Sequence, residues 1–152
     1  MRIRPMTSLD LPEVLRIEHD TFPMGWVGSM FEAELDGPVS HSVVLETDDA
    51  LVGYALYRVV LDEAHLMNIA VEHIHRGRGL GMQLLEHIMQ DSEALGAQHM
   101  FLEVRVTNKI ARQLYSRSGF EEIGLRKRYY QDNGEDALLM ICPLPQKRET
   151  EG

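Results

Sequence analysis

The segment Arg76-Gly-Arg-Gly-Leu-Gly81 combines glycines and arginines at a spacing that could hold an anion. An apolar run from Leu66 to Val71 precedes it and an amphipathic pattern from Leu80 to Leu95 follows, which predicts a strand, a turn and a helix in that order. Glycines let a backbone approach a phosphate closely, and a helix start offers unpaired N–H groups and the positive end of its dipole. We predict that this turn binds the pyrophosphate of a coenzyme; a tight turn that binds nothing is the alternative.

Two common phosphate-binding motifs fail on spacing. A dinucleotide fingerprint needs glycines spaced G-x-G-x-x-G, whereas the position five after Gly77 is Met82. A P-loop needs a Gly-Lys-Ser/Thr ending, and the sequence has none. The turn therefore belongs to neither motif.

A carboxylate interrupts the apolar stretch that follows the amphipathic pattern, from Met100 to Val106. In a strand, Leu102 and Val104 share one face, and Glu103 lies on the other. A buried carboxylate is costly unless it is paired or useful. Glu103 is thus a candidate functional carboxylate, and a salt bridge to a nearby Arg or Lys, Arg105 included, is the alternative.

Tyr115 and Asn108 are the other candidates for chemistry. Ala111 and Tyr115 lie four residues apart on one helical face, so that Tyr115 can point toward a cleft; a tyrosine that only fills the core is the alternative. Asn108 is predicted to cap this helix, and a cap near a ligand can also contact it.

Metal and nucleophile chemistry are not indicated. His73 and His75 are two residues apart with no Cys or carboxylate cluster around them, so we predict no metal site. No Gly-x-Ser-x-Gly elbow occurs, and Cys142 has no obvious histidine partner, which disfavours a nucleophilic hydrolase. We interpret Cys142 as a small core residue.

The charge balance limits the partners. Fifteen basic and 24 acidic residues give a formal charge of −9, which argues against direct nucleic-acid binding. This charge suits a cationic substrate, although an acidic solvated surface explains it equally well. The first ten residues lack a signal-peptide core, and no apolar stretch approaches the roughly 18 residues of a membrane span, so a cytoplasmic protein is expected.

The hydrophobic patterns predict one mixed α/β domain over residues 1–145 and a charged tail over 146–152. The expected fold is a central, mostly antiparallel mixed sheet of about six to seven strands with helices on both faces. The breaker-rich loop from Phe22 to Ser29 carries Trp26 and either covers a cleft or fastens a helix to the core. Strands are expected at 1–6, 42–46, 51–60, 65–71, 100–106, 120–126 and 137–142, and helices from near Thr7 to before Pro23, at 29–35, at 80–95 with Leu95 buried, and at 108–118.

Together these residues resemble the GNAT family of N-acetyltransferases. That family's phosphate turn reads Gln/Arg-x-x-Gly-x-Gly/Ala, and Arg76, Gly79 and Gly81 match it. Further segments resemble the RimI branch, whose members acetylate the N-terminal alanine of a small-subunit ribosomal protein. These segments are Val60–Val71, Leu102–Arg105, Leu114-Tyr115 with Gly119-Phe120, and Arg128–Tyr130 with Glu135–Ala137.

The resemblance implies acetyl-CoA as cosubstrate and a role for each matched residue. Glu103 would deprotonate the α-ammonium of a protein N-terminus, and Tyr115 would protonate the departing thiolate. The strand backbone would bind the pantetheine arm, the turn amides the pyrophosphate, and Asn108 the coenzyme further along. The implied coenzyme-binding residues are Ile69, Ala70, Val71, Arg76, Gly77, Arg78, Gly79, Leu80, Gly81, Met82 and Asn108.

The resemblance also bears on the acceptor. It implies the N-terminal alanine of a basic ribosomal protein, with no direct nucleic-acid or membrane partner. The loop from Pro23 to Gly28 is two residues longer than the family's Pro-Trp-Ser loop, and that loop neighbours the peptide site in relatives. A lysine side chain or a small-molecule amine as acceptor, or a non-catalytic acetyl-CoA-binding module, are the alternatives.

Overall fold

The computed structural model describes residues 1–22 and 25–145. Pro23 and Met24 of the predicted loop, and the predicted tail 146–152, lie outside the described residues, and the domain boundary at 145 stays a prediction. In chain order the elements are β1 (Arg2–Pro5), η1 (Ser8–Asp10), α1 (Leu11–Thr21), α2 (Gly28–Leu35), β2 (Ser40–Thr47), β3 (Ala50–Val60), β4 (Glu63–Val71), η2 (His73–His75), α3 (Leu80–Ala94), β5 (His99–Arg105), α4 (Lys109–Arg117), β6 (Glu121–Arg126) and β7 (Ala137–Pro143).

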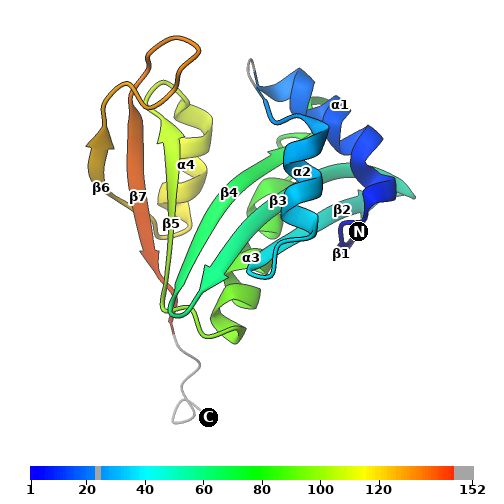
Figure 1. Ribbon diagram of the computed structural model, residues 1–152, viewed down its shortest axis with the longest axis horizontal. Helices are drawn as coiled ribbons and strands as arrows, with labels where there is room; N and C mark the ends of the chain where they lie inside the picture. The colour runs from blue at the N-terminus through cyan, green and yellow to red at the C-terminus, as the bar shows by residue number, and fades with distance from the viewer. Residues whose placement is uncertain (23–24, 146–152) are drawn as a thin grey trace.

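The strands form one seven-stranded sheet in the order β1-β2-β3-β4-β5-β7-β6 (Figure 1). Only β4 and β5 are parallel; the other five neighbouring pairs are antiparallel. The two carboxyl-terminal strands pair as an antiparallel hairpin, and β7 lies between β5 and the edge strand β6. The predicted mixed, mostly antiparallel sheet is confirmed.

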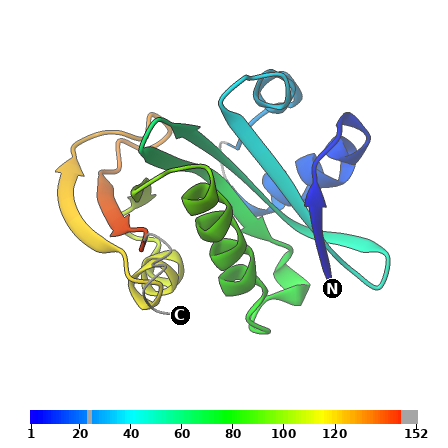
Figure 2. The same ribbon diagram turned by 90° about the horizontal axis from the view of Figure 1, so that it is seen from below.

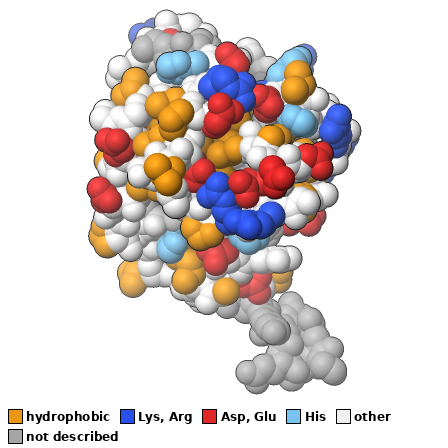
Figure 3. Space-filling view, turned by 90° about the vertical axis from the view of Figure 1, so that its right-hand side faces the viewer, with side chains coloured by type: hydrophobic (Ala, Val, Ile, Leu, Met, Phe, Trp, Pro, Cys, Tyr) orange, Lys and Arg blue, Asp and Glu red, His pale blue; other side chains and the backbone are white. Residues whose placement is uncertain are grey.

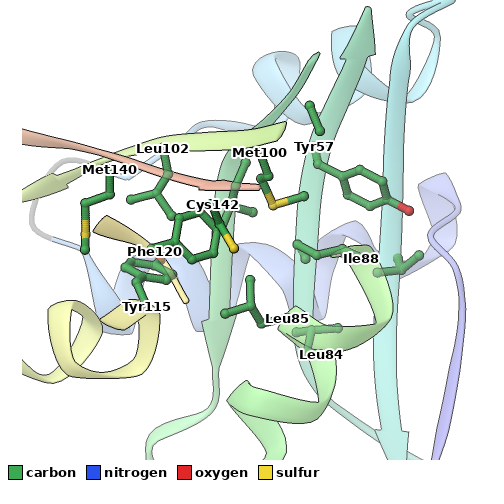
Figure 4. Close-up of a cluster of buried hydrophobic side chains, with 14 of the residues drawn as sticks. Tyr57, Leu84, Leu85, Ile88, Met100, Leu102, Tyr115, Phe120, Met140 and Cys142 are labelled. Atoms are coloured by element: carbon green, nitrogen blue, oxygen red, sulfur yellow. The ribbon is translucent and has the colours of Figure 1, made fainter. Parts of the chain in front are cut away.

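Helices cover both faces of this sheet (Figure 2). On one face, α1 and α2 pack on the central strands through a cluster that includes Val14, Ile17 and Phe31. On the other face, α3 and α4 pack through a larger cluster, part of which is seen in Figure 4. The sheet is therefore the middle layer of three, and a side chain on a strand faces one of two separate cores.

The helix ends follow their capping signals, but one residue predicted to be buried at a helix end is exposed. Thr7 and Asp10 form a capping box at the predicted helix start, although the first turn is 3₁₀ rather than α. Gly96 follows α3 with φ of +101°, as a helix stop requires. The prediction that Leu95 is buried is wrong: it is 48% exposed, because α3 ends at Ala94 and the chain turns before Leu95 can reach the core.

The two parallel strands separate soon after they meet. Pairing of β4 with β5 runs only from Glu63 opposite His99 to His65 opposite Phe101. Beyond this point the strands diverge into a V, visible in Figure 1. Past these pairs, the facing edges of β4 and β5 no longer hydrogen-bond to each other, and the sheet is open at its centre.

A β-bulge in β4 adjoins this opening. Leu56 pairs with Asn68 and Tyr57 pairs with Leu66, so Met67 is an extra residue in the strand. The bulge shifts the alternation of side chains: Leu66 faces the core beneath α3, whereas Asn68 reaches α1 on the other face. A strict period of two therefore cannot describe β4.

Charged side chains of both signs are interspersed on the face shown in Figure 3. Several arginines pair with carboxylates, among them Arg4 with Asp10 at 2.7 Å and Arg58 with Glu34 at 2.5 Å. In the described part of the chain, none of the helices is long and apolar enough to cross a membrane.

Candidate active site

A cavity of about 230 Å³ lies where β4 and β5 separate. Side chains reach it from both faces of the sheet: Glu103 lies on the face of α1, whereas Tyr115 belongs to α4 on the opposite face. The opening between the strands thus brings together two candidates that a closed sheet would keep apart. The lining residues are Glu18, Phe22, Gly25, Trp26, Leu66, Met67, Asn68, Ile69, Leu102, Glu103, Val104, Arg105, Asn108, Ala111, Tyr115 and Tyr130.

Glu103 is paired, but not with the residues that the sequence suggested. Its side chain is 9% exposed, and its Oε1 lies 2.9 Å from Nε2 of His65. Burial is the largest cause of the raised pKa values of Tyr129 and Tyr130. The nearby Glu103 carboxylate also raises them, because a negative charge opposes phenol ionisation. The carboxylate therefore lies in a half-enclosed site at the cavity wall, beside neutral tyrosines and a histidine.

Arg105 pairs elsewhere. Its guanidinium donates to Asp132 at 2.8 Å and to Glu135 at 3.3 Å, and it lies 4.0 Å from the ring centroid of Tyr130. These contacts fasten the β6–β7 loop to β5 and place Tyr130 at the cavity. Burial is the main cause of a Tyr130 pKa of about 12, so this hydroxyl stays protonated at neutral pH.

Tyr115 is both a core residue and a cavity residue. It is 6% exposed, and its ring centroid lies 5.7 Å from that of Phe120. Figure 4 shows the two rings side by side. Burial raises the pKa of Tyr115 well above its usual value, with a smaller contribution from Tyr130. The hydroxyl has no hydrogen-bond partner among residues 1–22 and 25–145. Both interpretations of this tyrosine are therefore compatible with its position.

A second buried carboxylate, missed in the sequence, lies at the other wall. Glu18 of α1 is 1% exposed and accepts hydrogen bonds from the Tyr54 hydroxyl, from Asn68 Nδ2 at 2.8 Å and from the Trp26 N–H at 2.8 Å. A Cβ at Gly25 would lie 2.8 Å from Oε2 of Glu18, so only glycine permits this approach. Glu18 sits at helical spacing from Leu11 and Val14, which is the signal that could have revealed it.

Glu18 connects three parts of the site. It fastens the loop after α1 to the bulged region of β4, and Trp26 of that loop packs against Phe31 with ring centroids 5.3 Å apart. The loop also lines the cavity through Phe22 and Trp26. It thus both borders a cleft and packs against a helix, which are the two roles that the sequence left open.

The glycine-rich turn presents free backbone donors beside the cavity strand. Gly77 and Gly79 have φ of +81° and +76°, and a Cβ at either would meet no atom within 4 Å. The Gln83 N–H donates to the Gly79 carbonyl at 3.1 Å. The N–H groups of Leu80, Gly81 and Met82 come before this first bond of α3 and have no acceptor among the described residues. This arrangement fits a phosphate group.

Most of the remaining predicted coenzyme residues lie in the end of β4, in the turn itself and in the first turn of α3. The Glu72 N–H donates a hydrogen bond to the Val52 carbonyl of β3. The backbone groups of Ile69 and Val71 therefore point to the opposite edge of β4, toward the opening. Arg76 donates from Nε to the Val71 carbonyl at 2.9 Å and so braces the turn against β4. The side chains of Ala70, Val71 and Leu80 are buried, Arg78 is exposed, and Met82 accepts a hydrogen bond from the Ser118 hydroxyl.

Asn108 has the predicted capping role. Its Oδ1 accepts from the Ala111 N–H at 3.2 Å, at the start of α4. It also lines the cavity, so a cap and a ligand contact are compatible here.

As for metals, the described ranges contain no group of three or more His, Cys, Asp or Glu side chains that could hold an ion.

The site combines a carboxylate, a protonated hydroxyl and a turn with unpaired N–H groups. A carboxylate at one wall can take a proton from an amine, and a hydroxyl at the other can give one to a leaving group. The free N–H groups lie at the end of the strand that borders the cavity, so a phosphate-bearing substrate could extend from the turn into it. These features are compatible with transfer of a group to an amine, and the described residues that line the cavity include no Ser, Thr, Cys or Lys.

The comparison with protein families agrees with this chemistry. The acetyltransferase (GNAT) family model matches residues 11–120, which is most of the chain. The chain belongs to this family, and the resemblance inferred from its motifs is confirmed. Enzymes of the GNAT family use acetyl-CoA.

Individual relatives narrow the class. The ribosomal protein bS18-alanine N-acetyltransferase of Salmonella typhimurium is 37% identical over 141 residues, which cover 91% of this chain and 95% of that protein. The crystal structure of ribosomal-protein-S18-alanine N-acetyltransferase from Escherichia coli matches with a TM-score of 0.88 and 35% identity, covering 97% of this chain and 96% of that one. Within the family, the chain is a RimI-like N-acetyltransferase.

A more distant structure shows how far the fold extends. Arabidopsis thaliana NAA60 in complex with acetyl-CoA matches with a TM-score of 0.84 at 20% identity, covering 94% of this chain and 98% of that one. At this identity the likeness shows the fold alone.

Proposed function

We propose that this N-acetyltransferase moves the acetyl group of acetyl-CoA to the N-terminal α-amine of a ribosomal protein that begins with alanine, as the printed names of its relatives suggest. The observation that carries the proposal is the cavity between β4 and β5, which Glu103 and Tyr115 both line, together with the free N–H groups of the turn that follows β4. A protein of this class needs all three parts in one place.

On the coenzyme side, acetyl-CoA supplies the thioester that the amine attacks. The N–H groups from Gly77 to Met82 would bind its pyrophosphate, and the backbone of Ile69 and Val71 at the open edge of β4 would bind the pantetheine arm. Arg76 would hold the turn in place through the Val71 carbonyl. Asn108 and the other predicted residues of this segment complete the coenzyme wall.

On the acceptor side, the proton leaves before the C–N bond forms. An α-ammonium has a pKa of about 8 and is largely charged at neutral pH, so it cannot attack until it loses a proton. Glu103 would take this proton. As the C–S bond breaks, Tyr115 would give its hydroxyl proton to the thiolate, because burial keeps that hydroxyl protonated.

The acceptor is proposed to be basic. The chain carries a formal charge of −9, and the cavity contains two carboxylates, Glu18 and Glu103. Such a field favours the approach of a cationic peptide. We further propose a cytoplasmic location, because ribosomal proteins are the proposed acceptors.

A peptide competition tests the acceptor class. An Ala-initiated basic peptide and its N-blocked form, which retains a lysine, are offered together with acetyl-CoA, and mass spectrometry locates the acetyl group. We expect acetylation of the free N-terminus alone. Acetyl-lysine on the blocked peptide would favour a lysine acceptor, and no thiol release with any amine would favour a non-catalytic binding module.

Substituting Gly79→Ala tests the coenzyme turn. Alanine at φ of +76° costs about 1–2 kcal/mol of stability, and its methyl group would stand beside the unpaired N–H groups. We expect the KM for acetyl-CoA to rise, by about tenfold for each 1.4 kcal/mol of lost binding. The control is Gly134→Ala between β6 and β7, which has φ of +71° and equally open surroundings, so that it bears the same strain outside the turn. Equal acetyl-CoA KM values for both variants would argue against the assigned turn.

A further inference from the structure

His65 is the hydrogen-bond partner of Glu103. Nε2 of the imidazole lies 2.9 Å from Oε1, and no other described side chain or backbone group hydrogen-bonds this carboxylate. A base must be ionised to accept a proton, and an ionised carboxylate can only accept hydrogen bonds. The hydrogen in this contact is therefore carried by Nε2 of His65 when Glu103 is ready to act.

The imidazole is itself held in place. Its ring stacks on Phe101 with centroids 4.3 Å apart and planes 14° from parallel. His65 and Phe101 are also the last register pair of β4 and β5 before the strands separate. The histidine thus sits at the fork of the V, where the backbone is fixed on both sides and the cavity begins.

The contact leaves one oxygen of the base free. His65 engages Oε1 from the fork, while Oε2 has no partner among the described residues. A carboxylate side chain has rotatable bonds, and a lone one at a cavity wall would occupy several rotamers. Holding Oε1 reduces this freedom and keeps the other oxygen available to an acceptor amine.

We propose that His65 is a positioning residue that orients Glu103 for proton abstraction. The inference rests on the proposed function, because it assumes that Glu103 is the base. His65 does not touch the reacting atoms; it acts through the carboxylate. Misplacement of a reacting group by about 1 Å can cost on the order of 10²-fold in rate.

The test compares His65→Phe with His65→Gln. Phenylalanine keeps an aromatic ring to stack on Phe101 but has no N–H, whereas glutamine carries an amide N–H near the place of Nε2. We expect His65→Phe to lower kcat by about 10-fold to 100-fold with an unchanged KM for acetyl-CoA, and His65→Gln to recover most of the loss. The matched control is His41→Phe: His41 also stacks on an aromatic ring, that of Tyr57 at 5.4 Å, outside the cavity, so its kcat should stay at the wild-type value.

The double variant His65→Phe/Glu103→Gln shows through which group His65 acts. If His65 works through the carboxylate, the double variant is no slower than Glu103→Gln alone. A further loss by the full factor of the single His65 variant would overturn the inference, and so would a His65→Phe enzyme at wild-type kcat or a His65→Gln enzyme no faster than His65→Phe.

Failure of the inference and failure of the proposed function are separable. Full turnover by the Glu103→Gln enzyme would rule out Glu103 as the base, whatever the His65 variants do. Slow turnover by Glu103→Gln together with normal turnover by His65→Phe would rule out only the positioning role of His65.

Discussion

Replacing Glu103 by glutamine is expected to lower turnover by roughly 10²–10⁴-fold while acetyl-CoA still binds. The amide keeps the size of the side chain and can still meet His65, but it cannot accept the proton of an α-ammonium. Steady-state thiol release with an Ala-initiated peptide gives kcat, and calorimetric titration gives the affinity for acetyl-CoA. The proposed coenzyme wall is made by other residues, so only the first quantity should change.

The pH dependence distinguishes a base from a structural carboxylate. An α-ammonium with a pKa near 8 is increasingly deprotonated in solution as the pH rises, and the need for a base falls with it. The deficit of Glu103→Gln should therefore shrink between about pH 7 and pH 9. A deficit that stays constant over this range would indicate that Glu103 acts by holding the site together.

A matched control comes from a carboxylate of similar burial. The Glu34 side chain is 11% exposed and pairs with Arg58 away from the cavity. Glu34→Gln removes a carboxylate of similar burial together with its ion pair to Arg58, so it should change stability and leave kcat alone. If Glu34→Gln lowered kcat equally, the loss at Glu103 could not be assigned to proton transfer.

Most elements of the fold could be predicted because each carries a local signal. Three such signals are the Asp48-Asp49 turn between β2 and β3, the Gly96 stop after α3 and the Asn108 cap of α4. Each is decided by neighbouring residues, and the structure contains all three. The position of β7 between β5 and β6 could not be predicted, since a hairpin fixes which strands pair but not on which side it joins a sheet. The V between β4 and β5 depends on tertiary packing and has no sequence signal of its own.

The candidate site shows the same division. The glycine turn, Glu103 and Tyr115 were found because each stands out from its own segment. Glu18 could have been found as a carboxylate on the apolar face of α1, whereas its partner Asn68 faces it only because a bulge at Met67 shifts the strand. The contact of His65 with Glu103 required the register of β4 against β5, which no pattern within either strand contains.

Replacing Tyr115 by phenylalanine is expected to lower kcat by roughly 10²–10⁴-fold without loss of acetyl-CoA binding or stability. The ring keeps its contact with Phe120, and the hydroxyl has no hydrogen-bond partner in the described chain, so its removal leaves no buried group unpaired. Thermal unfolding and thiol release on the same preparation measure both properties. A Tyr115→Phe enzyme at wild-type kcat would contradict the role of general acid.

The raised pKa of Tyr115 adds a prediction for the wild-type enzyme. A group whose pKa is raised in the folded state keeps its proton at pH values where a free tyrosine, with a pKa of about 10, would lose it. Turnover should therefore not fall through ionisation of this acid as the pH reaches 10. The same preference for the neutral phenol stabilises the fold below about pH 10, and this contribution is lost as the pH rises above it.

Tyr54→Phe is the control that separates catalysis from structure. The Tyr54 hydroxyl is buried and donates to Glu18, so its removal leaves that carboxylate with one donor fewer and should cost about 1–3 kcal/mol of stability. Its acetylation chemistry should be retained at temperatures where the variant is folded, because Tyr54 does not line the cavity. The two tyrosines thus predict opposite outcomes: loss of turnover without loss of stability at Tyr115, and the reverse at Tyr54. Equal loss of stability in both variants would show that the Tyr115 hydroxyl serves the fold rather than the leaving thiolate.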